Sequence, residues 1–230
     1  MQLSSPSREV MSRRASAARK KVELGSPDFT VFVVDDDNVL REAIREVLIS
    51  VGHAVETFSS VEEFVARRHA DTPGCLVLDV RLPGMSGLGL HKVLCASDRP
   101  MPTIFITGHA DTAMTVEAMK SGAVDFLAKP FRDQDLLDAI QSALHLDRKR
   151  RDEERQVAAI LASYRTLTPR EREVMWLVVE GQISKQIALA TNISEATVKI
   201  HRSQMMRKMG APSLPSLVRM ADELRRNGIA

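Results

Sequence analysis

Three short apolar runs, each ending at a side chain that carries oxygen, constrain the fold of this chain more than any other feature. They are TVFVV at 30–34, followed by Asp35, CLVL at 75–78, followed by Asp79, and TIFIT at 103–107, which ends in Thr107. Such unbroken runs are typical of strands buried on both faces of a parallel sheet. Shorter strand-like segments lie at 54–58 and 124–127.

Helical patterns separate these strands. Apolar residues recur at helical spacing in the segments 39–49, 61–68, 88–94, 113–119 and 136–146. Strands that alternate with helices are typical of doubly wound sheets with helices on both faces. We therefore predict an α/β domain at 29–146, built on a doubly wound, five-stranded parallel sheet.

The remaining chain is predicted to be helical. No Gly or Pro interrupts it from Asp133 to about Ala162, and the stretch DRKRRDEERQ at 147–156 mixes charges of both signs, as exposed helices do. We expect a helical linker at 147–163 that continues the last helix of the first domain. A second, smaller all-α domain of four short helices follows at 164–230, because the helical pattern is broken at Thr168-Pro169, Gly181, Thr191-Asn192, Gly210 and Pro212.

The two predicted domains differ in charge. Residues 29–146 hold 10 basic and 17 acidic side chains, a net charge of −7, whereas residues 164–230 hold 11 and 6, a net charge of +5. An acidic domain can hold cations, and a basic one can approach phosphates. Residues 1–28, with 6 basic and 3 acidic side chains, are expected to form a mobile basic tail.

Composition argues against several classes of protein. Cys75 and Cys95 are the only cysteines, and they form no Cys/His cluster, so neither a disulfide framework nor a zinc site is indicated. No apolar stretch approaches the roughly 20 residues of a membrane span. We therefore expect a cytoplasmic protein without a membrane partner.

Polar side chains collect where the predicted strands end. Asp35 and Asp36 follow the first strand, Asp79 the third, Thr107 ends the fourth, and Lys129 follows the fifth. The carboxyl ends of parallel strands meet at one edge, where three carboxylates would repel unless a cation such as Mg²⁺ lay among them. A carboxylate there can accept a phosphoryl group whose charge is shared by Mg²⁺, an ammonium and a hydroxyl.

Four motifs support this interpretation, namely VVDDDN at 33–38, LDVRLPGMSG at 78–87, FITGH at 105–109 and DFLAKPF at 125–131. In these motifs the chain resembles the flavodoxin-like receiver domains of two-component response regulators, over about residues 28–146. The resemblance implies that Asp79 is the phosphoacceptor and that Thr107 and Lys129 contact the phosphoryl oxygens.

The resemblance also implies a metal site and a switch. Mg²⁺ would be held by Asp79, by Asp35 and Asp36, and by the backbone carbonyl of Arg81. Phe126 would turn inward together with Thr107 on activation, and Lys129-Pro130 would be a cis peptide. Each residue also has a simpler structural interpretation, as a loop carboxylate, a helix cap or a core aromatic, but their joint placement favours the site.

One predicted helix of the second domain has two distinct faces. If Ser194 is its N-cap, helical spacing places Val198, His201, Met205 and Met209 on one stripe and Ala196, Lys199, Ile200, Ser203 and Arg207 opposite. An apolar stripe backed by a small, basic, hydroxyl-bearing face suits a recognition helix in the major groove of DNA.

The segments LTPREREVMWLVVEG at 167–181 and SKQIALATNISEATVKIHRSQMMRKMG at 184–210 resemble the LuxR-type helix-turn-helix of the NarL/FixJ class. The resemblance implies that Lys199, Ile200 and Ser203 read bases. It also implies phosphate contacts, which position the protein without specifying sequence, by Lys185, Thr197, Arg202 and Arg207. A structural salt bridge is an alternative role for Arg202.

Together these features resemble the FixJ/StyR-like response regulators. The resemblance implies a non-enzymatic transcription regulator that a sensor histidine kinase phosphorylates on Asp79. Phosphorylation would promote a homodimer through the face at 113–121 and 124–129. The dimer would bind double-stranded promoter DNA, with RNA polymerase as a further partner and activation as the expected effect.

Two alternatives come from other classes. Asp35, Asp37 and Val39 satisfy the DxDx[TV] pattern of haloacid-dehalogenase-like phosphatases, although Lys129 is followed by Pro130 and Phe131 rather than by the acidic pair which that fold needs. A protein-interaction adaptor with a basic helical tail is the other alternative. The two-faced helix argues against it.

Overall fold

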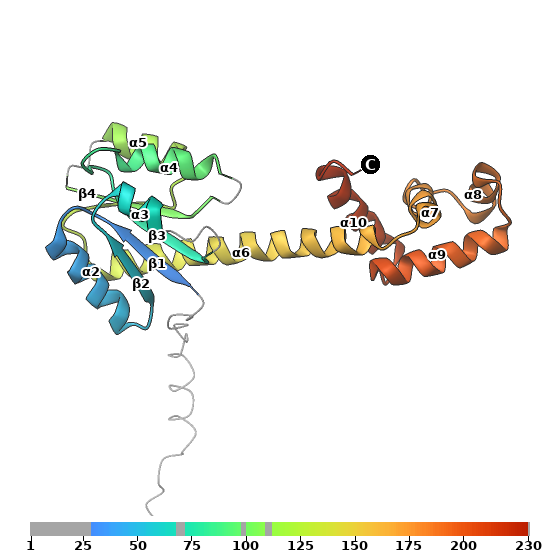
Figure 1. Ribbon diagram of the computed structural model, residues 1–230, viewed down its shortest axis with the longest axis horizontal. Helices are drawn as coiled ribbons and strands as arrows, with labels where there is room; N and C mark the ends of the chain where they lie inside the picture. The colour runs from blue at the N-terminus through green and yellow to red at the C-terminus, as the bar shows by residue number, and fades with distance from the viewer. Residues whose placement is uncertain (1–28, 68–71, 98–99, 109–111, 230) are drawn as a thin grey trace, which may run out of the picture. The chain divides into compact units, whose positions relative to one another are not determined.

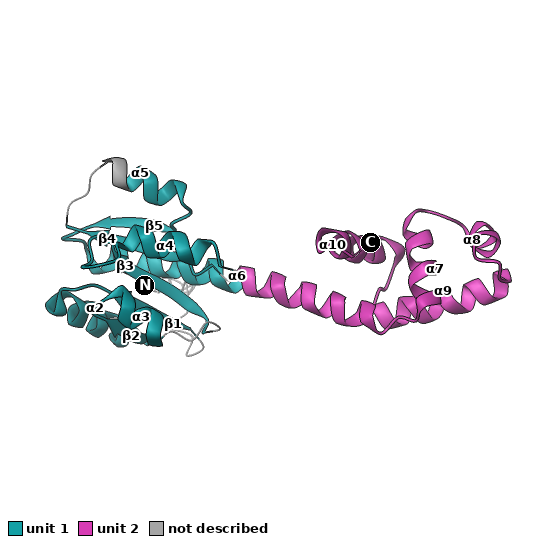
Figure 2. Ribbon diagram, turned by 45° about the horizontal axis from the view of Figure 1, so that its top comes forward, with its two compact units in different colours: residues 1–148 teal, residues 149–230 magenta. Residues whose placement is uncertain are grey.

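The structure is a computed structural model that describes residues 29–67, 72–97, 100–108 and 112–229. The chain divides into two compact units, residues 1–148 and 149–230 (Figure 2). The basic tail expected at 1–28 lies outside the described residues. Among the helices that the structure describes, none combines the length and the apolar character that a membrane span requires.

The first unit is built on the predicted five-stranded parallel sheet. Its strands pair in the order β2-β1-β3-β4-β5. They are β1 (Thr30–Val34), β2 (Ala54–Phe58), β3 (Gly74–Asp79), β4 (Thr103–Thr107) and β5 (Asp125–Ala128). The three central strands are almost fully buried, which explains their unbroken apolar sequences, whereas the edge strands β2 and β5 are partly exposed.

Helices cover both faces of this sheet, as expected for a doubly wound fold (Figure 1). α3 (Val61–Arg67), α4 (Gly87–Cys95) and α5 (Thr112–Lys120) lie on one face, and α2 (Asn38–Ser50) and α6 (Asp133–Arg165) lie on the other. Alternate residues of β1 serve the two cores, because successive side chains of a strand point to opposite faces. Phe32 packs in the first core and Val33 in the second.

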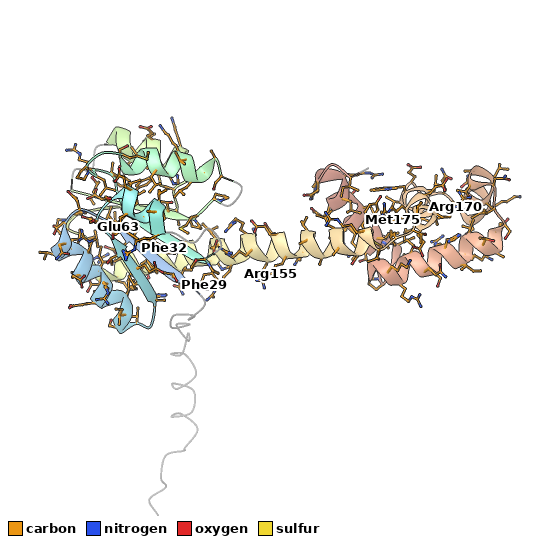
Figure 3. The ribbon with its side chains drawn as sticks, in the orientation of Figure 1. Phe29, Phe32, Glu63, Arg155, Arg170 and Met175 are labelled. Atoms are coloured by element: carbon orange, nitrogen blue, oxygen red, sulfur yellow. The ribbon has the colours of Figure 1, made fainter. Side chains whose placement is uncertain are left out.

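Helix α6 runs without a break for 33 residues, through the charged stretch that the sequence placed in a linker. Its first turns bury Leu136, Ile140 and Leu144 under the sheet. Its middle carries exposed pairs of opposite charge, such as that of Arg155 (labelled in Figure 3) with Asp152 at 2.5 Å.

One residue of the charged stretch departs from expectation. Asp147, grouped by sequence with the exposed charges, is only 1% exposed. The backbone N–H of Gly74, at the start of β3, donates to its carboxylate at 3.1 Å. The expectation of exposure was wrong for this residue, because periodicity within a helix does not reveal a long-range partner.

The second unit contains the four predicted short helices, α7 (Pro169–Val179), α8 (Ser184–Thr191), α9 (Glu195–Met209) and α10 (Leu214–Arg226). Three of the five predicted breaks have a local cause that the structure shows. Thr168 and Glu171 form a capping box at the start of α7, Ser194 caps α9, and Asn192 and Gly210 adopt left-handed conformations that end α8 and α9. Met175, fully buried, lies in the core that these helices share (Figure 3).

A buried ion pair joins α7 to the end of α9. The Lys208 ammonium lies 2.6 Å from the Glu171 carboxylate, which is 2% exposed. Burial alone would raise the pKa of Glu171, but the hydrogen bonds from Lys208 and from the Thr168 N–H outweigh it and lower the pKa below its usual value. The pair therefore stabilises the unit while Glu171 is ionised.

We predict that Lys208→Met destabilises the second unit by about 2 kcal/mol, because it leaves the Glu171 carboxylate buried without its cation. The lowered pKa means that the stability is present above the ordinary glutamate pKa and is lost as pH falls through the folded value. Urea unfolding followed by Trp176, the only tryptophan, should therefore show the difference from the parent shrinking at acid pH. The control is Arg226→Met, which removes an exposed ion pair with Glu223 and should change the stability little. Equal stability of Lys208→Met and the parent at pH 7 would contradict the prediction.

Candidate functional site

The predicted polar residues lie at the carboxyl edge of the sheet. Strand order reverses between β1 and β3, and ligands of open α/β sheets bind at such a switch point. Asp35 directly follows β1, and Asp79 is the last residue of β3. The fold thus brings two carboxylates, 44 positions apart in the sequence, onto neighbouring strands.

Lys129 bridges these two carboxylates. Its Nζ donates to Asp35 Oδ2 at 2.6 Å and to Asp79 Oδ2 at 2.5 Å. The side chains of Asp35 and Asp79 are 0% and 8% exposed, and that of Lys129 is 20% exposed. One ammonium therefore balances part of the negative charge that the fold concentrates here.

Burial and hydrogen bonding have opposite effects on the pKa values of Asp35 and Lys129. It raises the pKa of Asp35 above the usual aspartate value, although hydrogen bonds from Lys129 and from the Asp37 N–H act in the opposite direction. Burial would lower the pKa of Lys129, but its hydrogen bonds and attraction to Asp35 and Asp79 outweigh that effect and raise it. The lysine therefore stays a cation, and a further cation beside Asp35 would favour the carboxylate form.

Asp36 supplies the third carboxylate. Ligand oxygens of Asp35, Asp36 and Asp79 all lie within 4.8 Å of one another. Asp36 is exposed, and within the described part of the chain its side chain has no hydrogen bond or ion pair. Three oxygen donors with an open side toward solvent fit a hard cation that keeps several waters, as Mg²⁺ does.

Asp37 has a different role from its neighbours. Its carboxylate caps α2 by accepting from the N–H groups of Val39 and Leu40, at 2.9 and 3.3 Å. The second aspartate of the DxDx[TV] pattern is thus engaged with backbone rather than turned to the other carboxylates.

Other predicted residues lie at the same edge. The Arg81 N–H donates to Asp79 Oδ1 at 2.9 Å, and the Lys129 N–H donates to the carbonyl of the buried Thr107 at 2.7 Å. The Lys129-Pro130 peptide is cis, as predicted. Phe126, half-buried on β5, packs against the core with its ring centroid 6.5 Å from that of Phe105. His109 of the FITGH motif lies outside the described residues.

Gly87 sets how closely α4 approaches this edge. A Cβ on Gly87 would lie 2.1 Å from the Asp79 carbonyl oxygen and 3.1 Å from Leu78 Cγ. The Gly87 N–H also donates to the Val80 carbonyl at 3.1 Å. The glycine of the LDVRLPGMSG motif is therefore required by contact with the backbone of the site.

The second unit presents the two-faced helix as predicted. Val198, Met205 and Met209 are buried, and His201 is half-buried. The opposite face is exposed throughout, at Ala196, Lys199, Ile200, Ser203 and Arg207. Ile200 is 56% exposed, so an apolar side chain lies uncovered among polar neighbours.

The other predicted DNA contacts vary in exposure. Lys185 on α8 is exposed, whereas Thr197 and Arg202 are half-buried. The Thr197 hydroxyl lies 2.8 Å from that of Ser194 at the helix start. Among the described residues Arg202 has no salt bridge, so its alternative role as a structural ion pair has no support.

These two units define a class of protein, in which an α/β domain with an acid–lysine site precedes a helix-turn-helix domain. Residues 31–141 match the response regulator receiver domain family, and residues 165–221 match the luxR family of bacterial regulatory proteins. The chain belongs to the two-component response regulators with a LuxR-type DNA-binding domain. This is a family of transcription regulators rather than enzymes, which excludes the phosphatase and adaptor alternatives.

Relatives match along most of the chain. Nodulation protein W of Bradyrhizobium diazoefficiens is 50% identical over 194 residues, 84% of this chain and 86% of that protein. The transcriptional regulatory protein FixJ of Rhizobium meliloti is 44% identical over 195 residues, 84% of this chain and 95% of FixJ. The low-resolution structure of response regulator StyR matches with a TM-score of 0.78 and 45% identity, over 85% of this chain and 99% of StyR.

Sequence reasoning missed three residues that shape these sites. Arg41 donates to the carbonyl of Asp35, Gly87 contacts the backbone of Asp79, and Lys208 pairs with Glu171. The LDVRLPGMSG motif contained a signal for Gly87. Arg41 and Lys208 follow from tertiary or turn geometry that residue type does not reveal.

We predict that Gly87→Ala destabilises the first unit by about 1–3 kcal/mol, because the added Cβ meets backbone that cannot move aside. The matched control is Gly89→Ala, whose Cβ would lie 3.3 Å from Ser86 Oγ and which should be neutral or slightly stabilising. Urea unfolding followed by circular dichroism measures the effect, while Trp176 fluorescence reports the second unit separately. Equal losses in both variants would refute the role of the close contact.

Proposed function

We propose that a sensor histidine kinase phosphorylates this regulator on Asp79 and that the phosphorylated chain binds promoter DNA as a homodimer. The observation that carries the proposal is the Lys129 ammonium, which lies within 2.6 Å of both Asp35 and Asp79 at the switch point of the sheet. Receiver domains take phosphoryl groups from histidine kinases, and LuxR-type domains bind DNA, which supports both halves of the proposal.

In the transfer step, an oxygen of the Asp79 carboxylate attacks the phosphorus of a phosphohistidine. The P–O bond forms as the P–N bond breaks, and the electron pair of that bond returns to the imidazole nitrogen. The ammonium of Lys129 and the hydroxyl of Thr107 stabilise the phosphoryl oxygens. Asp79 gains negative charge in this step, which its cationic neighbour offsets.

The three clustered carboxylates and the Arg81 backbone carbonyl would hold Mg²⁺. When bound, Mg²⁺ neutralises charge on the transferring phosphoryl group. The exposed Asp36 would complete the ligand set from the solvent side, while the Lys129 ammonium donates hydrogen bonds to Asp35 and Asp79. Receiver domains generally bind Mg²⁺ at such a cluster, which supports this assignment.

Thr107 and Phe126 would carry the signal from the site to a dimerisation face. Thr107 ends β4 and Phe126 lies on β5, the neighbouring edge strand. The proposed face covers residues 113–121 and 124–129, where Val116 and Met119 are 44% and 47% exposed. The Met114 side chain of this face lies outside the described residues.

On the DNA, we propose that Lys199, Ile200 and Ser203 read bases in the major groove. Lys185, Thr197, Arg202 and Arg207 would contact phosphates and orient the domain. Two such helices in a dimer would match inverted half-sites. RNA polymerase would be the further partner, and activation the expected outcome.

A small phosphodonor with Mg²⁺ should label the full-length chain on Asp79 and convert it to a dimer. Asp79→Asn should abolish both the hydroxylamine-sensitive labelling and the dimerisation, because the amide is not a nucleophile for this step. Asp37→Asn, which keeps a capping oxygen for α2, is the control and should be labelled like the parent. Sedimentation measures the dimer. Undiminished labelling of Asp79→Asn would place the nucleophile elsewhere.

Substitutions on α9 should distinguish residues that read bases from residues that contact phosphates. Lys199→Ala should cost about 1–3 kcal/mol on a preferred site and flatten selection at one base position. Arg207→Ala should weaken binding to all sequences alike and reduce the salt slope by about 1. Titrations on specific and random duplexes at several salt concentrations test the contrast. If Lys199→Ala loses equal affinity on both duplexes, the assigned groove-facing surface is wrong.

A further inference from the structure

The three carboxylates of the proposed metal site differ in the hydrogen bonds that hold them in place. The carboxylate of Asp35 accepts from Lys129 and from the Asp37 N–H, and that of Asp79 accepts from Lys129 and from the Arg81 N–H. The Asp36 carboxylate has no such bond within the part of the chain that the structure describes. Its position therefore depends on the backbone that carries it.

The backbone that leads into Asp36 is held by hydrogen bonds at both the N–H and the carbonyl of Asp35. The Asp35 N–H donates to the Phe58 carbonyl on β2 at 3.2 Å. The Asp35 carbonyl, which belongs to the peptide unit leading into Asp36, accepts from Arg41 Nη1 at 2.6 Å. The second nitrogen of the same guanidinium, Nη2, donates to Asn38 Oδ1 at 2.9 Å.

Arginine suits this double contact because its guanidinium is planar and presents donors in a fixed fork. One rigid group thereby ties the Asp35 carbonyl to Asn38, the first residue of α2. The loop between them contains Asp36 and Asp37. The guanidinium donates to backbone and amide oxygens here, and the carboxylate of Asp35 is already satisfied by other donors.

We infer that Arg41 is a positioning residue for the metal site, which holds the Asp35–Asp36 peptide so that the Asp36 carboxylate stays beside Asp35 and Asp79. The inference rests on the proposed function, since it concerns the Mg²⁺ ligands of that site. It assigns to Arg41 a role that acts through Asp36, with no contact of its own to the metal.

The sign of the effect separates this role from simple electrostatics. Arg41 is a cation near a cation site, so removing its charge alone would strengthen Mg²⁺ binding by reducing repulsion. Loosening the loop would weaken binding, because one ligand would no longer be held in place. Groups that orient metal ligands typically contribute 10–100-fold in affinity.

The test is a titration of the full-length chain with Mg²⁺ alone, followed by backbone amide NMR shifts. Arg41→Met should bind Mg²⁺ roughly tenfold more weakly than the parent. Arg41→Lys, which keeps the charge but lacks the fork, should also bind more weakly. The matched control is Arg45→Met, which removes a charge one turn further along α2, where Arg45 pairs with the exposed Glu42 at 3.3 Å. It should bind as tightly as the parent or slightly more tightly.

Unchanged or tighter binding in Arg41→Met and Arg41→Lys would overturn the inference. Parent-like binding by Asp36→Asn would overturn it as well, because Arg41 is inferred to act through Asp36. Failure of the parent itself to bind Mg²⁺ would instead overturn the proposed metal site. Amide shifts before metal is added supply a second readout. In both Arg41 variants they should change around Asp36 and remain unchanged at β4. If Arg41→Met fails to fold, Arg41→Lys decides the question alone.

Discussion

The acid–lysine bridge at the carboxyl edge of the sheet is the interaction on which the first unit depends. Two nearly buried carboxylates on neighbouring strands repel each other and are poorly solvated, so their placement is unfavourable unless a cation lies beside them. Lys129 lies within hydrogen-bonding distance of both. The lysine reaches them because β5 lies beside β4, where its N–H is bound by the carbonyl of Thr107.

The second unit uses the same kind of pairing for a different purpose. The buried Glu171 carboxylate both completes the capping box of α7 and accepts from Lys208 near the end of α9. This internal pair, together with Met205 and Met209 in the core, fixes one side of α9. The other side is left exposed, and it is the face that we propose for DNA binding.

Charge therefore has separate roles in the two units of this response regulator. In the first, carboxylates are gathered around one ammonium and leave Asp36 open to solvent. In the second, basic side chains such as Lys199 and Arg207 lie exposed on a helix whose core side is apolar. Helix α6 belongs to both units, with Ile140 in the core of the first and Ile160 against the core of the second.

The sequence by itself determined the elements whose cause is local. Apolar runs marked the central strands, turn and capping residues marked the four short helices, and angular spacing separated Val198 from Lys199. It also placed Asp35, Asp79 and Lys129 at one edge, because parallel strands align their carboxyl ends. Only the tertiary structure decided the contacts between distant segments. Asp147 is buried against Gly74, Gly87 contacts the Asp79 backbone, and Lys208 pairs with Glu171. Each depends on how closely two elements approach, a distance that residue type and periodicity do not encode.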